Sequence, residues 1–319
     1  MPLLAQWGER IASAAARGAP LAIRGGGTKQ FYGNEARGEV FDTRGWQGIE
    51  SHEPSELVIT ARAGTPLSQV EAQLASRRQM LAFEPPHFGA DATLGGCVAA
   101  GLAGPRRAST GYAWGGVRDA VLGARLMDGR GRLLKFGGTV IKNVAGYDVS
   151  RLLAGSMGTL GVIVDVSLKV LPVPAAELTL RFECGEADAL RQLNSWGAQP
   201  LPLSASCWHG GRLWVRLSGS EPAVQASALA LGGEQEPGER ARTFWRDVRE
   251  QQLEYFAGAL PLWRFSVPTN APQLCLPGAQ LIEWGGALRW LRSDASAEQL
   301  RTRARQLGGH ATLFKGPSP

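Results

Sequence analysis

Residues 21–29 read Leu-Ala-Ile-Arg-Gly-Gly-Gly-Thr-Lys, a short apolar run followed by three glycines and two donor side chains. The apolar run predicts a strand, and the glycines predict a tight loop directly after it. Consecutive glycines can aim several backbone N–H groups into one concavity, which suits an anion such as a phosphate. Taken alone, however, such a triplet is as often an ordinary turn.

Two further glycine-rich segments lie in the same half of the chain. Residues 93–101 read TLGGCVAAG, whose small residues would let main chain lie against a flat ring or a pyrophosphate, or would pack as a tight helix on a sheet. The third segment joins NVAGYD at 143–148 to GSMGTLGVI at 155–163. Three such loops favour one large ligand over coincidental turns, while the GxGxxG and GxxxxGK[ST] fingerprints are absent.

Composition narrows the function classes. The 42 glycines in 319 residues are roughly twice the usual ~7% share. The net charge is +6 and the pI about 9.4, but arginine is spread along the chain and no nucleic-acid motif accompanies it, so we expect no nucleic-acid partner. The excess charge suits an acidic substrate, a phosphate-bearing cofactor or an acidic partner equally well.

Cysteine usage and the N-terminus indicate a reducing compartment without a membrane anchor. The four cysteines, at positions 97, 184, 207 and 275, form no CxxC pair, so neither a disulfide framework nor a zinc or iron–sulfur site is expected. We expect them to be small buried hydrophobic residues. Residues 1–18 carry charges at helical spacing and resemble neither a signal peptide nor a membrane anchor.

A domain boundary is predicted at Leu171-Pro172-Val173-Pro174, because each proline removes a ladder donor and stiffens the connection. The first domain would span 1–174 and the second 175–319. Beyond the boundary, predicted elements follow the order β-α-β-β-α and then α-β-β-β-α-β, an α+β arrangement. Residues 232–240 are polar and glycine-rich and are expected to form a mobile loop.

Seven motifs occur in order within 1–174: RGGGTK, LVITARAGTPL, EPPHFG, TLGGCVAAG, GVRDAVLGARLMDGRG, KNVAGYDVSRLLAGSMGTLGVI and SLKVLPVP. Together they resemble the FAD-binding domain of the vanillyl-alcohol oxidase or PCMH-type flavoproteins. Within that superfamily the chain is most similar to the FAD-binding E subunits of bacterial glycolate oxidases. Its tail, with LWRFSVP, QLIEWGGALRWLRS and GGHATLFKG, resembles their short C-terminal region. The implied fold is α+β, with a PCMH-type FAD-binding domain of two α+β subdomains followed by a short α+β cap-like domain.

The resemblance also implies which residues bind FAD, loop by loop. The first pyrophosphate loop would be Arg24, Gly25, Gly26, Gly27, Thr28 and Lys29. The second would contact the diphosphate and flavin by backbone and comprises Thr93, Leu94, Gly95 and Gly96. Along the cofactor would lie Pro85, Ser109, Gly111 and Tyr112, and its binding edge would be lined by Arg118 and Asp119. The adenine or ribitol side would be covered by Gly158, Gly161, Val162 and Ile163.

Departures from the family pattern refine the expectation. Covalent members carry a histidine in the first loop, whereas this chain has Thr28, so the resemblance implies dissociable, non-covalent FAD. His87 lies in a different loop and is expected to be an ordinary polar residue. Ala100 stands where many relatives have asparagine, and Met157 where hydroxy-acid dehydrogenases have glutamate. Both changes remove polar groups near the proposed cofactor.

The second half lacks the clustered histidines of related 2-hydroxy-acid dehydrogenases. It holds only His209 and His310, which are expected to be structural, so no metal site and no catalytic residue is assigned. Ten tryptophans are present in the chain, and Trp263, Trp284 and Trp290 are expected to pack in a core in preference to a partner surface.

The resemblance therefore implies an FAD-dependent oxidoreductase acting on the CH–OH group of 2-hydroxy acids, as a subunit of a glycolate oxidase that converts glycolate to glyoxylate. A larger FAD-binding subunit would abstract hydride and an iron–sulfur subunit would receive electrons. The complex would be cytoplasmic or peripheral to the inner membrane. Two alternatives remain: a stand-alone D-2-hydroxy-acid dehydrogenase with Arg264 or Arg289 binding the substrate carboxylate, and a non-catalytic scaffold.

Overall fold

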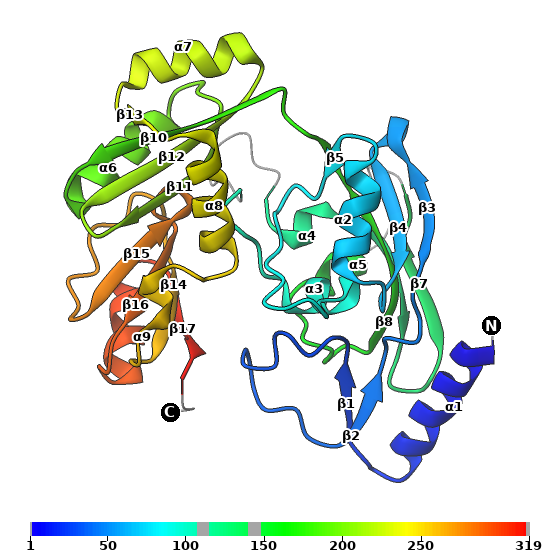
Figure 1. The fold of residues 1–319 in the computed structure, drawn as a ribbon. Coiled ribbons are helices and arrows are strands. Elements are labelled where there is room, and N and C mark those ends of the chain that lie inside the picture. The colour runs from blue at the N-terminus through cyan, green and yellow to red at the C-terminus, as the bar shows by residue number, and fades with distance from the viewer. Residues whose placement is uncertain (1, 107–114, 140–147, 317–319) are drawn as a thin grey trace. The chain divides into compact units, whose positions relative to one another are not determined.

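The computed structural model describes residues 2–106, 115–139 and 148–316. The chain forms two compact units (Figure 1). The first comprises Met1–Ala103 and Gly115–Val173, and the second comprises Gly104–Trp114 and Pro174–Pro319. Both combine helices with antiparallel sheets, so the α+β expectation is confirmed.

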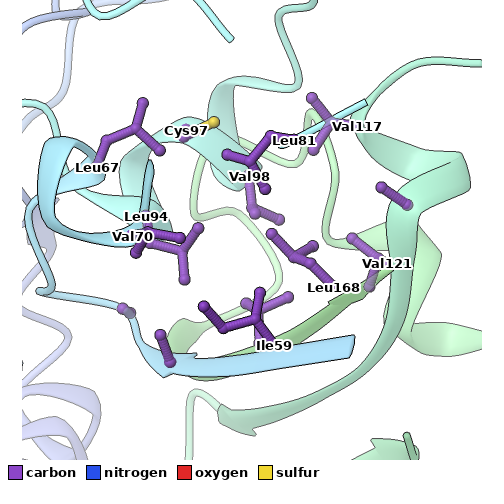
Figure 2. Packing of buried hydrophobic residues seen from close by; sticks show 14 of the residues in the cluster. Ile59, Leu67, Val70, Leu81, Leu94, Cys97, Val98, Val117, Val121 and Leu168 are labelled. Atoms are coloured by element: carbon purple, nitrogen blue, oxygen red, sulfur yellow. The ribbon is translucent and has the colours of Figure 1, made fainter. Parts of the chain in front are cut away.

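A five-stranded antiparallel sheet forms the centre of the first unit. Its strand order is β3 (Ile49–Glu53), β4 (Val58–Arg62), β8 (Val162–Lys169), β6 (Val121–Met127) and β7 (Leu133–Gly137). Helices α2 (Leu67–Ala75) and α3 (Leu94–Ala100) pack on this sheet through a buried core that includes Ile59, Leu94 and Leu168 (Figure 2). Helix α1 (Pro2–Ala16) packs in a separate cluster, where its Trp7 lies with Val162 and Val164 of β8.

Shorter elements complete the part of the first unit that the structure describes. The parallel pair β1 (Leu21–Arg24) and β2 (Glu39–Asp42) ends with Arg24 opposite Asp42, so the glycine loop starts where the pairing stops. The remaining elements are η1 (Pro54–Glu56), the antiparallel pair β5 (Gln79–Met80) and β9 (Leu171–Pro172), and the one-turn helices α4 (Val117–Ala120) and α5 (Val149–Leu152).

The second unit is built on an eight-stranded antiparallel sheet. Its strands, in spatial order, are β13 (Glu234–Gln235), β10 (Ala176–Glu183), β12 (Arg212–Gly219), β11 (Leu203–His209), β15 (Ala279–Glu283), β16 (Leu288–Arg292), β14 (Leu262–Ser266) and β17 (His310–Lys315). Its helices are α6 (Glu186–Gly197), α7 (Glu221–Leu231), α8 (Gly238–Arg249), α9 (Ala297–Gln306) and the short η2 (Glu254–Ala257) and η3 (Trp284–Gly286). The predicted order of strands and helices after the prolines is confirmed except for β13, an unpredicted strand between α7 and α8.

Two expectations about the second unit are wrong. Residues 232–240 are not a mobile loop, because β13 pairs with β10 and α8 begins at Gly238. Cys275 is exposed and Cys184 is partly exposed, whereas Cys97 and Cys207 are buried as expected. Predictions from local polarity and residue type were wrong at these positions because the pairing of β13 with β10 and the exposure of Cys275 are set by the tertiary structure.

Aromatic and basic side chains are buried in the second unit. Trp263, Trp284 and Trp290 are 3–4% exposed, which confirms core packing. Arg289 is fully buried, and its guanidinium donates to the carbonyl oxygens of Gly286 at 3.0 Å and of Pro272 and Ala271 at 2.5 Å each.

The segment Gly104–Arg106 belongs to the second unit although its neighbours in sequence, α3 and α4, belong to the first. Gly104 O accepts a hydrogen bond from Trp284 Nε1 at 3.0 Å, and Arg106 pairs with Glu177 at 2.8 Å. The division of the chain into domains 1–174 and 175–319 stays a prediction. Among the helices that the structure describes, none combines the length and apolarity needed to cross a membrane.

Candidate functional site

The glycine loop after β1 lies directly against residues 91–93. A Cβ atom on Gly25 would approach Thr93 Oγ1 to 2.4 Å, and one on Gly26 would reach 1.6 Å from Asp91 O. Gly27 has a φ of +73°, in the left-handed region that favours glycine. The triplet is therefore required by close main-chain approach and by backbone conformation, and it is more than an ordinary turn.

This loop presents several hydrogen-bond donors that the fold leaves available. Within the described parts of the chain, the backbone N–H groups of Gly25, Gly26, Gly27 and Thr28 have no hydrogen-bond acceptor. Arg24 bends back over the loop, with Nε 3.1 Å and Nη2 3.2 Å from where a Gly27 Cβ would lie. Successive free amides beside a guanidinium fit a diphosphate.

The second loop is built differently. Thr93 caps α3 by accepting the Gly96 N–H at 3.3 Å, and the N–H groups of Leu94 and Gly95 donate to Thr65 O at 2.9 Å and to Ala63 O at 2.7 Å. These three amides therefore already have acceptors inside the fold. Direct contacts between this loop and a cofactor stay a prediction, and what the geometry provides is a rigid support for the first loop.

The third loop is tied to the end of α3. The N–H groups of Gly155 and Met157 donate to Val98 O at 3.0 Å and to Ala99 O at 2.9 Å. A Cβ on Gly158 would lie 3.3 Å from Ile23 Cδ1, so the loop also approaches the end of β1.

Apolar side chains are exposed around these loops. Exposed fractions are 36% for Ile23, 41% for Met157 and 47% for Leu160. Val162 and Ile163, by contrast, are buried, Val162 in the same cluster as Trp7 and Ile163 in the core around Ile59. A cofactor could meet only their main chain.

Lys29, the last residue of the first loop, has a buried side chain. Its Nζ lies 3.1 Å from His87 O and 3.4 Å from Thr28 Oγ1, and it lies 5.6 Å from the centre of the Phe88 ring. Burial raises the pKa of the nearby Cys97 thiol to about 12, while the charge of Lys29 acts in the opposite direction. His87 Nε2 in turn lies 3.0 Å from Glu71 Oε2.

The remaining predicted residues are dispersed. Pro85 is buried in the segment before His87. Arg118 is exposed on α4, which contacts α5 and β6, and Asp119 Oδ2 accepts the Gly116 N–H at 2.8 Å and so caps that helix. Ser109, Gly111 and Tyr112 lie outside the described residues. The structure thus brings together the first loop, Thr93–Gly96 and Gly158.

Sequence reasoning missed two residues that shape the cradle. Asp91 contributes the carbonyl against which Gly26 lies, and Ala63, at the end of β4, accepts the Gly95 N–H and would meet a Gly95 Cβ at 2.6 Å. The one sequence signal for Ala63 is that it is a small residue within the LVITARAGTPL motif, and the structure places it directly after β4. Asp91 acts through its main chain, which leaves no signature in side-chain identity.

Acid–base candidates lie in the second unit. Glu283 is 4% exposed, and burial raises its pKa to about 7 although Trp290 Nε1 donates to it at 2.7 Å. His209 Nδ1 lies 3.2 Å from Gln280 O, which fits a structural role, and His310 is exposed. The residues that the structure describes include no group of three side chains able to hold a metal ion.

Comparisons with known proteins place this arrangement in a family. Residues 5–137 match the model of an FAD binding domain. The chain is 50% identical over 307 residues to "Glycolate oxidase subunit GlcE" of Escherichia coli strain K12, covering 96% of this chain and 85% of that protein. It is 35% identical over 156 residues to a D-lactate dehydrogenase of Archaeoglobus fulgidus, covering 48% of this chain and 33% of the relative.

A solved structure supports the fold. An alkyldihydroxyacetonephosphate synthase superposes with a TM-score of 0.66 at 16% identity, covering 96% of this chain and 69% of the synthase. At a sequence identity this low, the similarity shows only that the two proteins share a fold. Together with half of all residues shared along nearly the whole chain, these findings establish that the protein belongs to the family of the glycolate oxidase subunit GlcE and carries an FAD binding domain.

Proposed function

We propose that this protein is the FAD-binding subunit of a glycolate oxidase and takes part in converting glycolate to glyoxylate. The observation that carries the proposal is the row of free amides at Gly25–Thr28, held against Asp91 and Thr93 in a chain that is 50% identical to GlcE. FAD, when bound, supplies the two-electron chemistry of such a reaction.

The residues of this chain would bind and orient the cofactor. The amides of the first loop and the Arg24 guanidinium would hold the diphosphate. Ile23, Met157 and Leu160 would offer exposed apolar surface to a flat ring. The second loop would keep the first in place through Thr93 and Asp91.

We further propose that FAD is bound without a covalent link. Thr28 has no nucleophilic nitrogen to attack the flavin, and a Cβ on Gly89 would lie 3.1 Å from its methyl group, so Thr28 is packed against the neighbouring segment. Acid precipitation of the FAD-loaded protein should therefore leave the flavin in the supernatant, where its absorbance measures release. Flavin that stays with the precipitated chain would contradict the proposal.

The complex that we propose includes a larger FAD-binding catalytic subunit and an iron–sulfur subunit, working in the cytoplasm or at the inner membrane. Support comes from the word "subunit" in the relative's name. The free cysteines of this chain occupy separate positions, 97, 184, 207 and 275, so an electron-accepting cluster would come from a partner.

Reconstitution tests the proposal. The purified chain should bind about one equivalent of FAD and show no glycolate-dependent dye reduction alone. Glyoxylate formation should appear when the partner subunits are added. Failure of the wild-type chain to bind FAD would overturn the proposal, and it would leave the scaffold alternative standing.

A stand-alone D-2-hydroxy-acid dehydrogenase is a second candidate because of the similarity to the Archaeoglobus enzyme. The structure removes one of its two proposed carboxylate ligands, since the Arg289 guanidinium is fully buried among three carbonyl oxygens. Arg264 is partly exposed and lies 5.4 Å from the centre of the Trp284 ring. Reduction of a dye by D-lactate or glycolate with the isolated FAD-loaded chain would favour this candidate.

A further inference from the structure

The first loop runs alongside the segment 87–93 in the opposite chain direction. Gly25 approaches Thr93, Gly26 approaches Asp91, Thr28 approaches Gly89, and Lys29 Nζ reaches the His87 carbonyl at 3.1 Å. Each step forward along the loop thus meets an earlier residue of the segment. The position of the free amides therefore depends on the position of this segment.

The His87 side chain connects the segment 87–93 to helix α2. His87 Nε2 lies 3.0 Å from Glu71 Oε2, and the two side chains are 17% and 31% exposed. Glu71 lies on α2, whose Leu67, Val70 and Leu74 are completely buried in the core of the first unit. The contacts run from the core through Glu71 and His87 to Lys29, and from there to the loop.

We propose that Glu71 and His87 are positioning residues of the FAD cradle, which set the affinity for the cofactor without touching it. Lys29 then connects the first loop to the segment 87–93, because its ammonium group donates a hydrogen bond to the His87 carbonyl oxygen. This inference rests on the proposed function, because it concerns the same cradle.

Preorganisation is the physical reason for the effect. Exposed ion pairs contribute little to stability, and this pair is a partly buried hydrogen bond that restrains a loop. A restrained loop loses less conformational freedom when a ligand binds, so the affinity for the ligand is higher. Removing the restraint should therefore weaken FAD binding, while the core around α2 stays intact.

The chain offers a matched control on the same helix. Gln73 Nε2 lies 3.2 Å from His52 Nδ1, and His52 lies on β3, which takes no part in the cradle. Gln73 is two residues from Glu71, so Gln73→Leu removes a contact between α2 and a histidine that lies outside the cradle. Glu71→Gln keeps an acceptor for the His87 N–H and serves as the conservative variant.

The experiment measures the Kd of FAD for the full-length apoprotein by flavin fluorescence. Glu71→Leu and His87→Leu should each weaken binding by about five- to tenfold, the size of one hydrogen bond. The double variant should be no weaker than the worse single variant, because both remove the same contact. Gln73→Leu and Glu71→Gln should stay within about twofold of wild type.

A second readout separates positioning from general damage. The thermal midpoint of the apo forms should be the same for Glu71→Leu and for Gln73→Leu, and the visible circular dichroism of bound flavin should keep its shape. If Glu71→Leu does not fold, His87→Asn carries the same expectation, since its shorter side chain cannot reach Glu71.

The outcomes distinguish the two proposals. No FAD binding by the wild-type chain would overturn the proposed function. Wild-type binding combined with equal affinities for Glu71→Leu and Gln73→Leu would overturn the positioning role alone. Additive losses in the double variant, or an altered flavin spectrum, would also overturn it, because they indicate independent or direct contacts.

Discussion

Gly26 in the first loop leaves no room for a side chain. The gap between a Gly26 Cβ and Asp91 O would be 1.6 Å, and the obstacle is main chain that cannot rotate away. Gly129, in the turn between β6 and β7, is different, because a Cβ added there would have no atom within 4 Å. Two glycines in one unit therefore differ sharply in what an added methyl group would do.

Gly26→Ala should weaken FAD binding by more than about tenfold, because the loop must move away from Asp91 and its amides lose their common direction. Gly129→Ala is the control and should bind FAD like wild type. Titration of both apoproteins with FAD measures the effect. Equal affinities for the two variants would contradict the assignment of the first loop.

Arg289 shows how a buried cation is accommodated without an acid in contact. Its guanidinium donates to three carbonyl oxygens, and burial lowers its pKa to about 10. Arg289→Met should lower the free energy of unfolding of the second unit by about 3 kcal/mol, since buried carbonyls would lose their donors.

Urea unfolding followed by tryptophan fluorescence tests this loss of stability. Arg246→Met is the control, because the Arg246 side chain is 56% exposed. The expected change for the control is below about 0.5 kcal/mol. A similarly small change for Arg289→Met would show that the carbonyl contacts add nothing.

Among the elements, the hairpin of β15 and β16 carries the clearest pH response. Glu283 at the end of β15 is buried, accepts from Trp290 on β16 at 2.7 Å, and has its pKa raised from 4.5 to about 7. A carboxyl whose pKa is higher in the folded state holds its proton more tightly there. Its contribution to stability is complete below pH 4.5 and is lost as the pH rises towards 7.

Glu283→Gln should therefore remove a decline in stability of up to about 3 kcal/mol across this pH range, at ~1.4 kcal/mol for each unit of pKa. Above neutral pH the variant should be more stable than wild type. Urea unfolding at several pH values between 4.5 and 8 measures the difference between the two proteins. Parallel pH profiles would show that Glu283 is not held neutral by the fold.

At the scale of the whole molecule, the three loops that approach one another all belong to the first unit. A ligand that binds only the folded state stabilises the part it binds, by about 2.7 kcal/mol at a hundred times its Kd. FAD should therefore protect amides of α2 and α3 in the first unit far more than amides of β14 and β16 in the second. Hydrogen exchange with and without FAD measures this, and equal protection of both units would place the cofactor elsewhere.

Several elements could be predicted from local patterns because their signals are short-range. The apolar run that became β8 and the small residues that became α3 both carry their secondary structure in neighbouring residues. The glycine triplet likewise predicted a tight loop from neighbouring residues alone, and the order of the seven motifs assigned that loop to FAD binding. The prediction of a mobile loop at residues 232–240 was wrong, because β13 forms only through its pairing with β10.

The sequence by itself determined the family, the cofactor and the order of every predicted element, β13 not being among them, since these depend on residue types and their spacing. Only the tertiary structure decided which amides of the cradle are free. Gly25–Thr28 and Leu94–Gly96 look alike as glycine-rich segments, yet the first has no internal acceptors within the described chain and the second has three. The reason is that a hydrogen bond depends on where distant atoms such as Ala63 O and Thr65 O lie, and only the folded chain brings them there.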